Sequence, residues 1–370
     1  MTDKPESMEV IRSSRDADTM RIDLERWLAT KLAPDAAPIV ERSEGTSANG
    51  MSSETVLFDA SWADDGERST HHLVARIAPE GADVPVFPKY ELDKQYEIMR
   101  LVGELTDVPV PEMYWYESDP SHLGAPFFVM SRIDGRVPPD VMPYNFGDSW
   151  LSAEPVDRQQ ELVRNVVDVL VELHSMPVEQ LEFLEHDEPG ETALRRHVAH
   201  TRAWYEFAVD GLPRSPLIER GFEWLDENWP GEGEVVLSWG DSRIGNMMFD
   251  GVTTVAVLDW EMVGLAPRAL DLAWLVYAHR VFEDIAAVFE LPGMPDFLRP
   301  EDVRAIYIER SGVDPGPLDW YLTYCAVQWG IVFLRTSRRS IHFGETPEPD
   351  DIETTFQHTS SFEAFLRGEF

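Results

Sequence analysis

The sequence predicts an α+β protein with two lobes, on the basis of three observations. The first third of the chain is rich in strand-like segments. After about residue 135 the chain carries long amphipathic helical patterns around one short β segment. The length of 370 residues is sufficient for one large domain or two ordinary ones. We therefore expect a leader over residues 1–20, a β-rich N-lobe over 21–132 and a mostly helical C-lobe over 133–370.

The predicted N-lobe contains a helix, several strands and a second helix. Residues 21–34 read as a short amphipathic helix ended by a proline. Residues 38–62 predict a strand, a loop of small residues and a second strand, and the alternating segment THHLVARIA predicts a third. A helical pattern over 90–105 is followed by VPVPEMYWYE and APFFVMSRIDG, which predict two further strands around a proline-rich bend.

The predicted C-lobe is mostly helical. The segment DRQQELVRNVVDVLVELHSM places five apolar side chains and His174 on one helical face, so we expect a hydrogen-bonded core histidine. Further helices are predicted in ALRRHVAHTRAWYEFAV and LIERGFEWLDENW, before the β segment. Two more follow that segment, in ALDLAWLVYAHRVFEDIAAVFE and LDWYLTYCAVQWGIVFLRTSRRS. The single cysteine, Cys325, lies in the last of these and is expected to be buried, and one cysteine cannot form an intrachain disulfide.

Composition excludes several classes of partner. The formal net charge of -37 repels nucleic-acid phosphates and anionic membranes, so we expect neither partner. Only four lysines occur, and an anion site must therefore depend on arginine, backbone N–H groups or a metal. The polar N-terminus lacks an apolar signal core, and no apolar run reaches membrane-spanning length. A cytoplasmic protein is expected.

The segment LSWGDSRIGNMMFD, residues 237–250, carries the main chemical signal. The residues MMFD, Gly251 and TTVAVLD predict a β-hairpin. A hairpin returns the chain to its starting point, so Asn246 before the first strand and Asp259 after the second should lie close together. Asp241 lies on the loop that leads to the same end, with Arg243 nearby.

These residue types suit phosphoryl transfer. Hard cations such as Mg²⁺ prefer carboxylate and amide oxygens, which Asp259 and Asn246 supply. Asp241 would then accept the proton of an attacking hydroxyl. Any one of the three alone is more typical of a turn cap or a strand end. Three at this spacing, with a hairpin between them, favour a metal–phosphate site.

The pattern WGDSRIGN…VAVLDWE resembles the catalytic loop and metal-binding strand of the aminoglycoside phosphotransferase-like kinases, which include choline kinase relatives. It is most similar to the branch of kinase domains fused to acyl-CoA dehydrogenases. The resemblance covers about residues 21–345 and includes VPVPEMYW and GAPFFVMSRIDG. It implies a protein kinase-like bilobal fold with ATP in the cleft. It also implies ATP- and Mg-dependent transfer of the γ-phosphoryl group to a hydroxyl of a small molecule.

The resemblance assigns roles to individual residues. Asp241 resembles the catalytic base, Asn246 a magnesium ligand, and Asp259 the acid that holds the metals on the phosphates. Asp271 resembles the acid that braces the catalytic loop, and Arg76 stands where the family has a phosphate-gripping strand residue. The hinge that receives adenine through its backbone corresponds to Phe128, Val129, Met130 and Ser131.

The sequence departs from the family at three places. Trp239 stands where the catalytic motif usually has a histidine, a position that is largely structural in the family. In the glycine loop Gly45 and Gly50 fit the ends but Ser47 takes the middle, so phosphate contacts would fall to Ser47, Asn49 and backbone N–H groups. Gln95 stands where the helix usually offers a glutamate to the strand residue; Glu91 or Glu97 would replace it only in a shifted helix.

The acceptor remains open between two classes. An unusually aromatic C-lobe favours a hydroxyacyl or other lipid-like alcohol, whereas Glu283 and Asp284 favour a cationic, aminoglycoside-like acceptor. Arg335 to Ser340, RTSRRS, reads as the basic end of a helix or as a site for an anionic substrate tail. The altered glycine loop and the missing glutamate support one alternative, a nucleotide-binding pseudokinase or scaffold. A metal-dependent hydrolase is disfavoured, because the sequence shows no histidine cluster.

Overall fold

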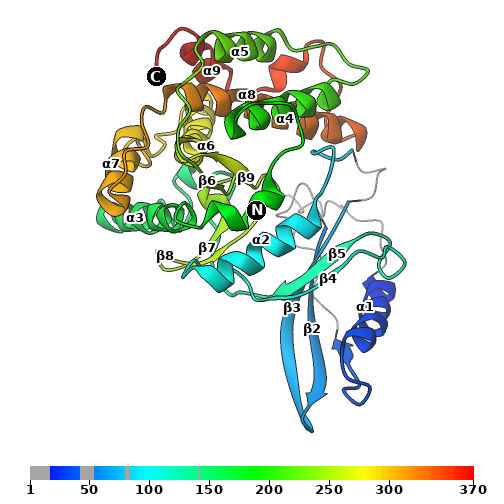
Figure 1. The fold of residues 1–370 in the computed structure, drawn as a ribbon. Coiled ribbons are helices and arrows are strands. Elements are labelled where there is room, and N and C mark those ends of the chain that lie inside the picture. The colour runs from blue at the N-terminus through cyan, green and yellow to red at the C-terminus, as the bar shows by residue number, and fades with distance from the viewer. Residues whose placement is uncertain (1–16, 42–53, 80–83, 141) are drawn as a thin grey trace, which may run out of the picture. The chain divides into compact units, whose positions relative to one another are not determined.

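The computed structural model describes residues 17–41, 54–79, 84–140 and 142–370. Figure 1 shows the course of the chain through its helices and strands. None of the helices in these ranges combines the length and the apolar composition that crossing a bilayer requires.

The chain divides into two compact units. The first comprises Met1–Glu80 and Met113–Arg132, and the second comprises Gly81–Glu112 and Ile133–Phe370. Residues 81–112 thus group with the second unit, although they fall within the span predicted as the N-lobe. The predicted lobe bounds themselves stay a prediction.

The first unit is built on an antiparallel sheet of five strands in the order β1-β2-β3-β5-β4. A tight turn at Asp65 and Gly66, both with positive φ, joins the two longest strands as the twist of a hairpin requires. The elements are α1 (Ala17–Lys31), β1 (Ile39–Glu41), β2 (Glu54–Asp64), β3 (Glu67–Ile77), β4 (Met113–Glu117) and β5 (Phe127–Ser131). The predicted first helix is present, but it begins at Ala17, inside the residues assigned to the leader.

Helix α1 packs on this sheet through a buried apolar face and one polar anchor. Trp27 is fully buried, and its ring meets Phe127 edge-on at 4.7 Å between centroids. Its indole Nε1 donates to Glu117 Oε2 at 3.0 Å, and Lys31 Nζ lies 2.8 Å from the same oxygen. Glu117 therefore fastens the helix to β4.

The second unit is mostly helical, as predicted. Its helices are α2 (Leu92–Leu105), α3 (Val156–Leu173), α4 (Ala193–Ala208), α5 (Pro216–Glu227), α6 (Ala269–Val288), α7 (Pro300–Ser311), α8 (Asp319–His342) and α9 (Thr359–Leu366). Its strands form two antiparallel pairs, β6 (Val235–Ser238) with β9 (Gly264–Pro267) and β7 (Met247–Asp250) with β8 (Thr253–Val257). Helices α5, α8 and α9 lie side by side (Figure 1).

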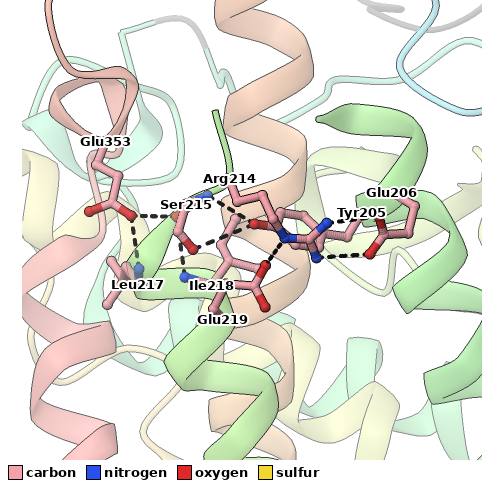
Figure 2. A network of polar contacts seen from close by, with 8 residues as sticks. All are labelled: Tyr205, Glu206, Arg214, Ser215, Leu217, Ile218, Glu219 and Glu353. Atoms are coloured by element: carbon pink, nitrogen blue, oxygen red, sulfur yellow. Dashed lines mark hydrogen bonds and ion pairs between the residues drawn. The ribbon is translucent and has the colours of Figure 1, made fainter. Parts of the chain in front are cut away.

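A polar network fixes the start of α5 (Figure 2). The Ser215 side chain caps the helix by accepting from the backbone N–H of Ile218, and Pro216 supplies the rigid first turn. Glu353, from the short helix η5 (Ile352–Thr355), accepts from the hydroxyl of Ser215 and from the N–H of Leu217. Arg214 forms ion pairs with Glu206 on α4 and with Glu219 on α5, so the network joins α4, α5 and η5.

Strand β9 corrects the expectation of one short β segment in the helical part. Its residues, GLAP, are buried without alternation, so a four-residue pattern of this kind carries no strand signal. Helices α7 and α9 also escaped prediction. Cys325 is buried on α8, as expected.

Candidate active site

The predicted hairpin is present and brings two functional candidates together. Strands β7 and β8 pair from Met247 opposite Val257 to Asp250 opposite Thr253. At the open end, the N–H of Leu258 donates to the carbonyl of Asn246 at 2.9 Å. Asp259 follows directly and has a φ of 60°, which is rare for a residue other than glycine and clusters at functional sites.

The loop between β6 and β7 contains a glycine that no other residue can replace without strain. Gly240 has a φ of 87°. A Cβ at this position would lie 2.1 Å from the carbonyl oxygen of Met262. The close approach places the loop against the segment after Asp259, so the two halves of the candidate site are held together by the backbone.

The carboxylate of Asp241 accepts hydrogen bonds from three side chains. The indole Nε1 of Trp274, on α6, donates to Oδ1 at 2.7 Å. The amide Nδ2 of Asn246 donates to Oδ2 at 2.7 Å. Arg243 Nε lies 3.1 and 3.2 Å from the two oxygens. The side chain is 14% exposed, so the carboxylate is fixed in orientation and still reachable.

Arg243 lies between two carboxylates. Its Nε faces Asp241, and its Nη1 forms an ion pair with Asp140. Burial alone lowers the pKa of the Arg243 guanidinium. The charges of Asp241, Asp140 and Asp259 outweigh burial and hold that pKa above its ordinary value. Arg243 therefore stays charged, and the negative charge of Asp259 at the hairpin end contributes to this.

Asp140 lies close to Gly245 as well as to Arg243. A Cβ added at Gly245 would lie 2.6 Å from Asp140 Oδ1 and 2.6 Å from Arg243 Nη1. Glycine at 245 thus makes room for the ion pair. Asp140 Oδ1 is buried and has no hydrogen-bond partner among the described residues.

Asp271 fixes the base of the loop from the start of α6. It is fully buried and accepts from the hydroxyl of Ser238 at 2.8 Å and from His174 Nε2 at 3.1 Å. The backbone N–H groups of Trp239 and Gly240 donate to it at 2.8 and 3.0 Å. These contacts satisfy a buried charge, which would otherwise be costly.

Near this loop the expectation for His174 is confirmed. His174 is a buried, hydrogen-bonded core histidine, and its Nδ1 lies 2.9 Å from the Tyr307 hydroxyl. Trp239 is buried in the position usually taken by histidine, and its Nε1 donates to the carbonyl of Leu258 at 3.1 Å. The tryptophan thus connects the loop to the end of the hairpin.

The candidates predicted for the nucleotide lie partly in the first unit. Arg76 is on β3 opposite Phe128, and its Nη1 donates to Thr55 Oγ1 at 3.0 Å. The predicted hinge lies in β5, the strand next to β3, at Phe128, Val129, Met130 and Ser131. Gly45, Ser47 and Asn49 lie outside the described residues.

The helix expected to offer an acid to Arg76 is α2, in the second unit. Gln95 is buried on it, with 4% exposure. Glu91 lies 3.1 Å from Lys94, and Glu97 lies 2.7 Å from Arg100. Both acids that would replace the missing glutamate thus have basic partners on α2.

Several polar residues named from the sequence have structural contacts. Arg335, the first residue of RTSRRS, donates from Nε and Nη2 to the carbonyl of Pro85 at 2.9 and 2.6 Å. Arg338 pairs with Glu348 at 2.9 Å. Glu283 accepts from the N–H of Met294 at 2.8 Å, and Asp284 lies 3.3 Å from Arg280.

Sequence reasoning missed two residues of the site. Trp274 lies three positions after Asp271 on α6, so the two side chains share a helical face. This spacing could have predicted that Trp274 lies near the same loop. Asp140 is 103 residues from its partner Arg243, and no local pattern predicts that contact.

The family model described as phosphotransferase enzyme family matches residues 50–300. The chain belongs to this family. The Arabidopsis thaliana protein named probable acyl-CoA dehydrogenase IBR3 is 26% identical over 74% of this chain and 33% of its own length. Human acyl-CoA dehydrogenase family member 11 is 29% identical over 54% of this chain and 24% of its own. The chain thus spans a third or less of these curated relatives.

Solved structures show that the fold is kinase-like. A Ralstonia eutropha protein assigned as an aminoglycoside phosphotransferase superposes with a TM-score of 0.63 at 18% identity, covering 94% of this chain and 97% of that one. Wild-type aminoglycoside 2'-phosphotransferase-IIIa superposes with a TM-score of 0.55 at 16% identity, covering 95% and 99%. The predicted α+β, protein kinase-like fold and the predicted membership of the phosphotransferase family, in the branch related to acyl-CoA dehydrogenase fusions, are confirmed.

Proposed function

We propose that the protein transfers the γ-phosphoryl group of ATP, with Mg²⁺, to a hydroxyl group of a small molecule. The observation that carries the proposal is the carboxylate of Asp241, oriented by Trp274, Asn246 and Arg243. It lies on the loop that leads into the hairpin ending at Asp259. Membership of the phosphotransferase family supports the same chemistry.

In the proposed reaction Asp241 orients the acceptor hydroxyl and takes its proton. As the hydroxyl oxygen forms a bond to the γ-phosphorus, the bond from that phosphorus to the β-phosphate oxygen breaks and ADP leaves. The hydrogen bonds to both carboxylate oxygens fix the direction from which the proton is accepted. Because Asn246 and Arg243 donate from the same loop and Trp274 donates from α6, the base is positioned before the acceptor arrives.

The residues proposed for Mg²⁺ fit a hard cation. Asn246 commits its amide nitrogen to Asp241, so its carbonyl oxygen is the atom that can bind a cation. Asp259 adds a carboxylate at the same end of the hairpin. When bound, Mg²⁺ neutralises charge that develops on the phosphates. Arg243, which stays charged, supplies further positive charge beside Asp241.

Nucleotide binding is supported by solved relatives of the same fold. Wild-type aminoglycoside 2'-phosphotransferase-IIIa was solved with GDP, and an aminoglycoside phosphotransferase APH(4)-Ia variant with ADP and hygromycin B. For this chain we infer that Arg76 and the backbone of Phe128–Ser131 contact the nucleotide, together with Gly45, Ser47, Asn49 and Gln95.

For the acceptor we infer a hydroxyacyl thioester or similar lipid-like alcohol ahead of an aminoglycoside. The names of the curated relatives contain acyl-CoA dehydrogenase, although the chain matches only a third or less of their length. Glu283 and Asp284, which would favour a cationic acceptor, already contact Met294 N–H and Arg280.

The test is ADP production from ATP and Mg²⁺ with a panel of hydroxyacyl thioesters and aminoglycosides. The wild type should turn over with at least one acceptor. Asp241→Asn should lower kcat by about 10²- to 10⁴-fold, the usual contribution of a general base, and should leave MgATP affinity nearly unchanged. Asp250→Asn, an exposed acid on the same hairpin, is the matched control and should retain turnover.

Two outcomes would count against the proposal. If the wild type binds nucleotide but produces ADP no faster than Asp241→Asn with every acceptor, the pseudokinase or scaffold alternative takes its place. If Asp241→Asn loses nucleotide binding along with turnover, the base has been assigned wrongly.

A further inference from the structure

Three potential metal ligands converge far from Asp241 in sequence. His186 and Glu188 lie in the connection between the short helix η3 (Glu182–Leu184) and α4, and His200 lies on α4. One ligand atom from each residue lies within 4.8 Å of the other two. The sequence predicted no histidine cluster, because these residues come together only when the connection folds back on α4.

The contacts within the cluster are close. His200 Nδ1 lies 2.8 Å from Glu188 Oε1. The rings of His186 and His200 stack with centroids 4.2 Å apart and planes 13° apart. Glu188 and His200 thus lie close enough for both side chains to offer a ligand atom to one ion.

A second observation concerns a ring nitrogen within the cluster. His186 Nε2 is buried and has no hydrogen-bond partner among the described residues. Buried polar atoms nearly always have a hydrogen-bond partner, so a buried atom without one needs an explanation, such as a bound ion or water. By contrast, both ring nitrogens of the core histidine His174 have partners, the Tyr307 hydroxyl and the Asp271 carboxylate.

Neighbouring charges do not exclude a cation. Arg196 pairs with Glu185 at 3.2 Å, and Lys94 pairs with Glu91 at 3.1 Å. Each nearby positive charge thus has its own acid, and Glu188 contributes a negative charge within the cluster. The side chain of His200 is 39% exposed and that of Glu188 26% exposed, which gives an ion a path of entry.

We propose that His186, Glu188 and His200 form a binding site for a borderline divalent ion of the Zn²⁺ class. Two imidazoles and one carboxylate suit Zn²⁺, Ni²⁺ or Cu²⁺ and disfavour Mg²⁺, which requires oxygen ligands. Parallel stacked rings cannot both point their nitrogens at one ion. Binding therefore turns one imidazole out of the stack, and water completes the coordination.

The position of the cluster indicates a structural role. A Cβ added at Gly264 would lie 3.2 Å from His186 Nε2, so this ring abuts β9. Gly264 pairs with Ser238, the last residue of β6, and Gly240 and Asp241 follow two and three positions later. A bound ion would link the connection before α4 to α4 itself. The linked segment would lie against β9, which pairs with β6, the strand that leads into the loop of Asp241. The inference does not depend on the proposed function.

The test is a Zn²⁺ titration of the full chain by calorimetry in excess Mg²⁺. We expect one Zn²⁺ per chain, bound at least about tenfold more weakly by His200→Ala and by Glu188→Gln, since even partners of metal ligands are worth that much. Both side chains are partly exposed, so these variants should fold. Co²⁺ should give the visible absorption of a tetrahedral centre with the wild type and lose it with His200→Ala.

Two controls separate this site from others. His342→Ala removes an exposed histidine outside the cluster, and Asp259→Ala removes the proposed magnesium ligand; both should bind Zn²⁺ as the wild type does. Equal affinity of His200→Ala and wild type, or no stoichiometric binding by the wild type, would overturn the proposal. Loss of binding in Asp259→Ala with retention in His200→Ala would assign the Zn²⁺ to the hairpin instead.

Discussion

The pair Asp140–Arg243 sets the electrostatics next to Asp241. The Arg243 guanidinium contacts both Asp140 and Asp241. Asp140 therefore reduces the positive charge that Arg243 presents to the proposed base, Asp241. We therefore expect Asp140 to act as a positioning residue, which contacts the proposed base only through Arg243.

Asp140→Asn keeps the shape of the side chain and removes its charge. We expect the free energy of unfolding to fall by about 1 kcal/mol, because Asp140 is 35% exposed and solvent screens the pair. The kcat should also fall with KM for ATP unchanged, since Arg243 would then turn fully onto Asp241. Denaturant unfolding and steady-state kinetics would measure the two effects. Asp148→Asn, an exposed acid nearby in sequence, is the control, and equal kinetics in both variants would refute the role of Asp140.

At the residue scale, the contacts that could be predicted from the sequence are those set by local spacing along the chain. The closeness of Asp241, Asn246 and Asp259 could be predicted, because a short hairpin joins Asn246 to Asp259 and Asp241 precedes Asn246 by five positions. Asp140 could not be found, because its contact depends on how distant segments pack. Trp274 was missed although its spacing from Asp271 is a usable signal, because the sequence does not show that its indole nitrogen faces a carboxylate.

At the element scale, the loop entering the hairpin depends on one glycine. Gly240→Ala should lower the free energy of unfolding by about 3 kcal/mol, combining a left-handed backbone with a clash against Met262. Gly316→Ala is a matched control, with a φ of 83° and no heavy atom within 4 Å of an added Cβ. It should cost only about 1 kcal/mol. Chemical denaturation compares them, and equal losses would show that the contact with Met262 is unimportant.

The attachment of α1 to β4 should depend on acid pH. The hydrogen bond from Lys31, followed by that from the N–H of Asp119, lowers the pKa of Glu117 from 4.5 to about 2. A carboxylate with a depressed folded pKa stabilises the protein above its unfolded pKa, and this stability is lost as pH falls from about 4.5 toward 2.

Glu117→Gln should remove that part of the pH dependence. We expect a loss of about 2 kcal/mol at neutral pH, the size of hydrogen bonds to a charged group, and a smaller difference from wild type at acid pH. Thermal melting of both proteins between neutral and acid pH makes the measurement. Glu112→Gln, an exposed acid one residue before β4, is the control. A difference between wild type and Glu117→Gln that does not shrink at acid pH would contradict the assignment.

Elements with strong periodicity could be predicted, and short buried ones could not. The 3.6-residue pattern identified α3 and α6, and alternation identified β3. Strand β9 is four buried residues with no period, and its position is set by pairing with β6 rather than by its own sequence.

At the scale of the whole molecule, the sequence predicted the fold class because a strand-rich part and a helical part follow each other along the chain. The histidine cluster at 186, 188 and 200 could not be predicted, because it depends on tertiary folding of the connection before α4. The net charge of -37 would repel an anionic nucleotide, so its binding must depend on local positive charge and on a metal.

The most direct test of the central claim is thermal melting of the wild type and Asp259→Ala with ATP, GTP and ADP, each with and without Mg²⁺. A nucleotide at 100 times its Kd stabilises the folded protein by about 2.7 kcal/mol. The account predicts a Mg²⁺-dependent rise in the Tm of the wild type that Asp259→Ala loses. No shift with any nucleotide, or the same Mg²⁺-dependent shift in both proteins, would contradict it.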